Sequence, residues 1–235
     1  MSSARAAASH TGALAGVDAV YSAAFRRAGI LRVNELDEVF DAVETLAARA
    51  DFRGDRLAIL TNGGGVGVLA TDTLMDQGGH LAELTSGTIA RLNGVLPPTW
   101  SHANPVDIIG DAQADRYAGA LEALVEAPEL DAVLVLNCPT AIASGTRSAE
   151  TVVDIAKRSK VGILTCWLGS SAAEPARRLF TAANIPTYDT PEKAVRGFMH
   201  LTRYHRAQEA LLEVPSSVTP EPRVDDSAVR AILSR

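Results

Sequence analysis

Cysteines, aromatic residues and long apolar runs are all scarce in this sequence. Its 235 residues include two cysteines, Cys138 and Cys166, both inside apolar stretches, and aromatic side chains make up 5% of the chain. Two such thiols do not form the disulfide framework of a secreted protein, which favours a reducing, cytoplasmic setting. No run approaches the roughly 18 apolar residues that cross a bilayer, and the N-terminus lacks the apolar core of a signal peptide. We therefore expect a cytoplasmic protein that is not bound to a membrane.

Positive charge is also limited. The chain has 22 Lys and Arg residues against 28 Asp and Glu residues, a formal net charge of −6. Binding to nucleic acid needs clustered basic side chains, whereas these are scattered singly or in pairs, so we expect no nucleic-acid partner. The hydrophobic content of 47% can bury a core and excludes intrinsic disorder. Small molecules and proteins remain as the expected partners.

Short apolar runs alternate with longer amphipathic segments along most of the chain. The runs AVLVLN (132–137) and GILTCWL (162–168) are apolar without alternation, as strands covered on both faces must be. Strands that alternate with helices predict an α/β fold with a doubly wound parallel sheet. The expected strands are 30–33, 57–61, 81–84, 132–137, 162–168 and 186–188. The expected helices are 17–28, 34–50, 66–77, 88–95, 112–126, 149–159, 172–183 and 192–210.

The segment TNGGGVGVLATD places three glycines between an expected strand and helix. Glycines let the backbone approach an anion closely, and the free N–H groups of a helix start attract negative charge. The predicted phosphate-binding residues here are Asn62, Gly63, Gly64, Gly65 and Val66. Simple tight packing of the helix against the strand is an equally weighted alternative.

The same glycines also allow a dinucleotide-binding interpretation. Gly65, Gly67 and Ala70 spell the pattern G-x-G-x-x-A, and Glu83 follows the next expected strand, where a ribose-binding acid belongs. This pattern alone has low specificity. An NAD(P)-binding oxidoreductase domain is therefore kept only as an alternative.

The segment SHTGALAG contains an accessible histidine among small residues. His10 is flanked by Ser9, Thr11 and Gly12, and a neutral imidazole can accept a phosphoryl group covalently. An ordinary solvated loop histidine is the alternative interpretation.

The segment NPVDIIGDA is a third candidate, because loops beyond the carboxyl ends of parallel strands form the ligand crevice. Asn104, Asp107 and Gly110 are its candidate ligand-crevice residues, and a structural Asx turn is the alternative. The histidines and cysteines show no metal-ligand spacing, so we expect no metal site in this chain.

Several motifs, taken in order, resemble the NDP-forming acyl-CoA synthetases. These are SHTGALAG, AFRRAGILRV, TNGGGVGVLATD, NPVDIIGDA and IPTYDTPEKAV, and they span about residues 5 to 210. The family includes ADP-forming acetate–CoA ligase and is related to succinyl-CoA synthetase. It also supplies the ligase-like part of some bacterial protein lysine acetyltransferases.

The resemblance implies a role and a domain plan. His10 would be the phosphohistidine that carries phosphate between the acyl phosphate site and the ADP site, and the turn 62–65 would help to hold it. Residues 1–52 would be the tail of the phosphohistidine domain, a partial α/β lobe. Residues 53–205 would form a flavodoxin-like, succinyl-CoA synthetase-like ligase domain, and 206–235 a linker with a C-terminal stub.

The resemblance also implies missing parts. The full enzyme uses coenzyme A and ATP or ADP with Mg²⁺, bound mainly by CoA-binding and ATP-grasp domains that this chain does not contain. These domains would be its partners, together with a small carboxylate or acyl-CoA, and the isolated chain is expected to be inactive. A truncated first lobe would leave an apolar edge that favours an oligomer. A regulatory ligase-like module of a protein lysine acetyltransferase is the alternative function.

Overall fold

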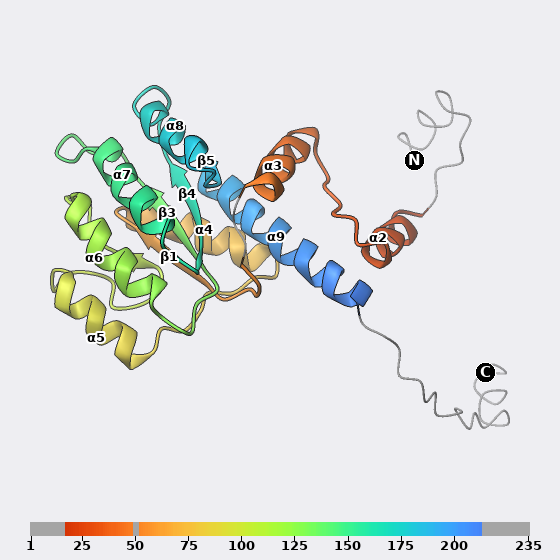
Figure 1. The fold of residues 1–235 in the computed structure, drawn as a ribbon, viewed down its shortest axis with the longest axis horizontal. Coiled ribbons are helices and arrows are strands. Elements are labelled where there is room, and N and C mark those ends of the chain that lie inside the picture. The colour runs from red at the N-terminus through yellow and green to blue at the C-terminus, as the bar shows by residue number, and fades with distance from the viewer. Residues whose placement is uncertain (1–16, 49–51, 213–235) are drawn as a thin grey trace, which may run out of the picture.

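The computed structural model describes residues 17–48 and 52–212, which include a parallel sheet flanked by helices (Figure 1). Its strands lie in the order β2-β1-β3-β4-β5, and each neighbouring pair is parallel. This is the strand order of the flavodoxin-like doubly wound fold, so the predicted α/β fold class is confirmed. The strands are β1 (Leu57–Thr61), β2 (Val106–Asp107), β3 (Ala132–Asn137), β4 (Gly162–Trp167) and β5 (Thr187–Tyr188).

Helices cover both faces of the sheet (Figure 1). On one face α4 packs against α9, and on the other α5, α6, α7 and α8 pack in a row. These helices are α4 (Gly64–Asp76), α5 (Ser86–Val95), α6 (Ala114–Val125), α7 (Gly145–Ala156), α8 (Glu174–Ala182) and α9 (Pro191–Leu212). Within the described residues, no helix has both the length and the apolar character needed to cross a membrane.

The side chains of β1 explain why the central strands are apolar throughout. Leu57 and Ile59 belong to the core cluster under α4 and α9, whereas Ala58 and Leu60 belong to the cluster under the other helices. All four side chains are fully buried. Successive strand residues point to opposite faces, so a strand covered on both sides needs apolar residues at every position.

Two further helices from the N-terminal part of the chain, α2 (Asp18–Arg27) and α3 (Leu36–Ala47), lie against α9. The side of α3 that is buried carries Glu38, Ala42 and Thr45. The apolar stripe of α3 is exposed instead, and it consists of Leu36, Val39, Phe40, Val43 and Leu46. The apolar stripe of α3 is therefore not covered by any other element in the described part of the chain.

Two expected strands are not formed as predicted. Residues 30–33 have no strand assignment, and the predicted strand there is wrong. An isolated extended segment gains nothing without a neighbour to pair with, and within 17–48 and 52–212 no strand lies beside it. Residues 81–84 contribute only a single bridge, between Leu81 and Leu57. The pairing position further along β1 is taken by β2, which the sequence pattern did not reveal.

Candidate functional site

Of the predicted crevice residues from residue 62 onward, the turn 62–66, Asp107 and Gly110 lie at the carboxyl edge of the sheet, whereas Asn104 lies beside the first half of β1. Thr61, the last residue of β1, pairs with Asp107 of β2, and the β1–β3 register aligns Thr61 with Leu136. The loops that follow β1, β2 and β3 therefore leave the sheet together. The remaining predicted residues, Ser9, His10, Thr11 and Gly12, lie outside the described residues.

The start of α4 presents free backbone donors at this edge. Gly63 is the N-cap residue, its N–H donates to the Thr61 hydroxyl, and its carbonyl accepts from Val66 and Gly67. Gly64 and Gly65 are exposed, and their N–H groups have no partner among the described residues. The first turn of α4 contains no acidic residue that would neutralise the helix dipole. This helix start therefore has the donors and the polarity that suit an anion.

The four glycines of this segment have different roles. A Cβ on Gly63 would lie 2.5 Å from Sγ of Cys138, and one on Gly67 would lie 3.1 Å from Cγ2 of Thr61. A Cβ on Gly64 would lie 2.8 Å from Oδ2 of Asp107. A Cβ on Gly65 would meet nothing within 4 Å. Tight packing thus accounts for Gly63 and Gly67, and Gly65 is the position that packing leaves unexplained.

Substitution by alanine should separate these roles. Gly63→Ala should lower the free energy of unfolding by about 1–3 kcal/mol, because the new methyl group overlaps the Cys138 thiol. Gly65→Ala is the matched control and should change it by less than about 0.5 kcal/mol. Urea unfolding of both variants measures the difference. Equal destabilisation by the two substitutions would contradict this assignment.

Asn62 links two loops rather than pointing a free amide into the crevice. Its side-chain N–H donates to the carbonyl of Cys138 at 2.9 Å, and its side-chain oxygen accepts from the N–H of Cys138 at 2.7 Å. The side chain is buried, with 3% of the residue exposed. Asn62 therefore fixes the loop after β3 against the glycine turn.

Asn104 is likewise committed to the backbone. Its side-chain oxygen accepts from the N–H of Ile59, and its amide nitrogen donates to the carbonyls of Leu57 and Ala82. The carboxamide fills the gap at the edge of β1 between the Leu81 bridge and β2. It completes the sheet edge at the position where the predicted strand 81–84 stops.

Asp107 lies closest to the open helix start. Its Oδ1 accepts from the N–H of Ile109 at 2.9 Å, which is the geometry of an Asx turn, and its Oδ2 lies over Gly64. Ile109 has φ of 70°, an unusual value for a β-branched residue, and such strain is frequent beside ligand sites. Gly110 lies against the carbonyl of Asn62, 3.7 Å from the position of a Cβ. Asp107 and Gly110 therefore do border the glycine turn.

The loops after β3 and β4 complete the edge. Burial, and secondarily the negative charge of Asp107, raises the pKa of Cys138, so its thiol stays protonated at neutral pH. Arg177 donates to the carbonyls of Trp167, Gly169 and Ser170 after β4. Neither Thr61, which caps the turn, nor Arg177 was singled out from the sequence. A polar residue at the end of an apolar strand was the only local hint of Thr61.

The geometry does not favour a dinucleotide site. Leu81 pairs with Leu57, the first residue of β1, and Ala82 donates to the carbonyl of Leu57. The chain then leaves the sheet, so Glu83 emerges before the carboxyl edge at which α4 begins. A ribose-binding acid belongs at the carboxyl end of its strand.

Comparison with known proteins agrees with the fold. The family model "Ligase-CoA domain" matches residues 57–210, and "Succinyl-CoA ligase like flavodoxin domain" matches residues 1–46. The alpha subunit of ADP-forming acetate–CoA ligase I from Pyrococcus furiosus is 37% identical over 205 residues, which cover 86% of this chain and 44% of that protein. ADP-forming 4-hydroxybutyrate–CoA ligase from Nitrosopumilus maritimus is 30% identical, covering 86% of this chain and 29% of that protein.

A solved structure is also similar. It is the dinucleotide-forming acetyl-coenzyme A synthetase 1 of Ca. Korarchaeum cryptofilum in complex with phosphate and ADP, with 36% identity and a TM-score of 0.83. The match covers 90% of this chain and 47% of that one. This chain thus spans less than half the length of these relatives. Because the family model covers residues 57–210, more than half of the sequence, the chain belongs to the Ligase-CoA domain family.

Proposed function

We propose that this chain is part of an NDP-forming acyl-CoA synthetase of the acetate–CoA ligase type. The observation that carries the proposal is the exposed start of α4, where Gly64 and Gly65 offer unpartnered N–H groups at the carboxyl edge of a flavodoxin-like sheet. Relatives with this domain are named as ADP-forming CoA ligases. A helix start of this kind suits a phosphoryl group in transit.

In this proposal His10 is the group that carries the phosphate. Its imidazole nitrogen attacks the phosphorus of an acyl phosphate, a P–N bond forms, and the carboxylate leaves with the electrons of the broken P–O bond. The phosphoryl group then passes to ADP, and the imidazole is regenerated. The backbone from Asn62 to Val66 holds the phosphoryl group, and Ser9, Thr11 and Gly12 allow the histidine loop to approach. We place the phosphate on the Gly65 side, because the Asp107 carboxylate lies over Gly64.

Other domains must supply the remaining functions. The chain spans 44% of the P. furiosus subunit, and we propose that CoA-binding and ATP-grasp domains, on the same or another polypeptide, bind coenzyme A and ADP or ATP with Mg²⁺. We assign residues 1–52 to the end of the phosphohistidine domain, 53–205 to the ligase domain and 206–235 to a linker with a stub. The two family models, which end at 46 and begin at 57, support a boundary in this region. The exposed apolar stripe of α3 is a contact surface for such a partner.

Reconstitution tests the proposal. This chain is mixed with the polypeptide or polypeptides that carry the other domains, and ATP formation is measured from acetyl-CoA, ADP, Mg²⁺ and phosphate. ATP should form only in the complete mixture, and neither part alone should produce it. Equal ATP formation when this chain is omitted would refute the proposed function.

A further inference from the structure

A second cavity lies far from the glycine turn, between α3, α9 and the end of α4. It has a volume of about 340 Å³, and its charged and titratable lining residues are Arg32, Glu38, Asp76, Arg196, His200 and Arg203. Asp76 is the last residue of α4, whereas Gly64 is the first. Thirteen residues at 1.5 Å each separate the two ends by about 20 Å. The cavity is therefore distinct from the candidate phosphate turn.

Two buried nitrogen atoms on residues that line this cavity lack hydrogen-bond partners within the described residues. His200 is 3% exposed, and its Nδ1 has no partner among the described residues; the same holds for the buried Nε of Arg196. In the described part of the chain, the Arg196 guanidinium donates no hydrogen bond, and its nearest carboxylate oxygen, on Glu38, lies 3.9 Å away. Buried polar atoms are nearly always paired, so the Nε–H of Arg196 lacks an acceptor, and Nδ1 of His200 lacks an acceptor or a donor according to its tautomer.

The other two guanidinium groups are already engaged. Arg32 pairs with Asp18, and Arg203 donates to the carbonyl of Gln77. Glu38 accepts from the N–H of Asn34. The cavity lining thus holds three guanidinium groups and the carboxylates of Glu38 and Asp76, and Arg32 is paired with a carboxylate outside the lining. Burial lowers the pKa of His200, so its imidazole is neutral near pH 7 and one ring nitrogen carries a proton.

We propose that this cavity binds a phosphate group through the Arg196 guanidinium, beside the imidazole of His200. A planar guanidinium presents paired N–H groups that match two phosphate oxygens, and such charge-assisted hydrogen bonds are strong. The occupant supplies an acceptor for the part-exposed guanidinium of Arg196, which donates no hydrogen bond within the described residues.

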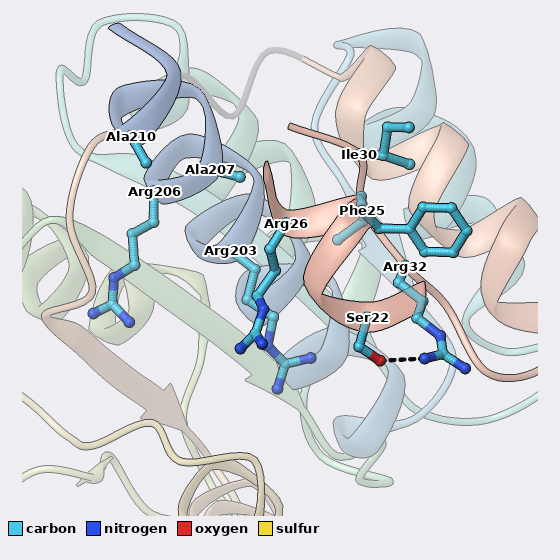
Figure 2. Close-up of a pocket in the computed structure, with 10 residues that line it drawn as sticks. Ser22, Phe25, Arg26, Ile30, Arg32, Arg203, Arg206, Ala207 and Ala210 are labelled. Atoms are coloured by element: carbon cyan, nitrogen blue, oxygen red, sulfur yellow. Dashed lines mark hydrogen bonds between the residues drawn. The ribbon is translucent and has the colours of Figure 1, made fainter. Parts of the chain in front are cut away.

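The phosphate has room to carry an organic substituent. Arg32 and Arg203 also line a neighbouring pocket of about 470 Å³ between α2 and α9, which Figure 2 shows. Phe25, Ile30 and Ala207 give that pocket apolar walls. The phosphate group can therefore come from inorganic phosphate or from a phosphate ester with an apolar body.

Titration calorimetry of the full 235-residue chain tests the site, with inorganic phosphate and phenyl phosphate as probes at constant ionic strength. Gly65→Asp, which adds a carboxylate at the open helix start, serves as the background that removes binding at the glycine turn. In this background both probes should bind at millimolar concentration or below. Arg196→Gln should weaken this binding about tenfold or more. Arg196→Lys should weaken it less, because lysine keeps the positive charge but lacks the paired N–H groups of the planar guanidinium.

Two further variants guard the interpretation. Arg203→Gln changes an exposed residue and should also weaken binding, so the site stays testable if Arg196→Gln does not fold. Arg178→Gln removes an exposed arginine that pairs with Glu174 on α8, and it should have no effect. Tighter binding of phenyl phosphate than of phosphate supports use of the Figure 2 pocket, and equal binding supports free phosphate. No binding of either probe in the Gly65→Asp background, or unchanged affinity in both Arg196→Gln and Arg203→Gln, overturns the proposal.

Discussion

Replacement of His10 by alanine should reduce ATP formation by the assembled enzyme at least about 10⁴-fold, the scale on which removal of a covalent nucleophile acts. The proposed route has no second nucleophile at the glycine turn: Asn62 is bonded to Cys138, and burial keeps the Cys138 thiol protonated. Initial rates from acetyl phosphate and ADP measure the loss, because this substrate bypasses the CoA-dependent step.

A labelling experiment and a second histidine provide the controls. Labelled ATP should place acid-labile, base-stable phosphate on the wild-type chain in the assembly and none on His10→Ala. His80→Ala changes a histidine whose side chain is 58% exposed and should behave as wild type in both assays. If His10→Ala were labelled as well as the wild type, the phosphohistidine assignment would be wrong.

Asn104→Ala should have the largest effect on stability, a loss of about 2–4 kcal/mol in the free energy of unfolding. The substitution removes three hydrogen bonds, and it leaves the N–H of Ile59 and the carbonyl of Ala82 without this partner, whereas the carbonyl of Leu57 keeps its bond from the N–H of Ala82. Each such bond contributes about 0.5–1.5 kcal/mol net, and an unpaired buried group costs more than the average bond. Urea unfolding monitored by circular dichroism measures the change.

Asn93→Ala is the matched control for this prediction. Asn93 is exposed and accepts a single hydrogen bond, from the indole N–H of Trp100 at 2.8 Å. Its loss should cost about 1 kcal/mol or less. If Asn104→Ala were no more destabilising than Asn93→Ala, the carboxamide of Asn104 would not be holding the sheet edge.

Central strands could be predicted well from the sequence, and edge strands could not. The predicted strands 57–61 and 132–137 match β1 and β3, because strands buried on both faces require continuous apolar runs. β2 has only two residues, Val106 and Asp107, too few to show any periodicity. Its pairing with Leu60 and Thr61 joins segments that are more than 40 residues apart, and no local pattern encodes it.

The candidate site shows the same division. The run Asn62–Val66 predicts a helix start that suits an anion, and α4 does begin there, at Gly64. The run does not reveal which glycine is needed for packing, because that depends on Cys138, Thr61 and Asp107 from three different strands or loops. Asn104 was predicted as a crevice residue, but its three backbone bonds become visible only when the sheet edge is assembled.

The sequence by itself determined the α/β class, the central parallel strands and the glycine turn, because each depends on residue types that are adjacent in the chain. The tertiary structure decided which polar groups have hydrogen-bond partners and which do not. The side chains of Asn62 and Asn104 bond to the backbone, whereas the N–H groups of Gly64 and Gly65 and the Arg196 guanidinium have no hydrogen-bond partner within the described residues. The sequence does not reveal these partners, because the hydrogen bonds and close contacts join residues that are far apart in the chain.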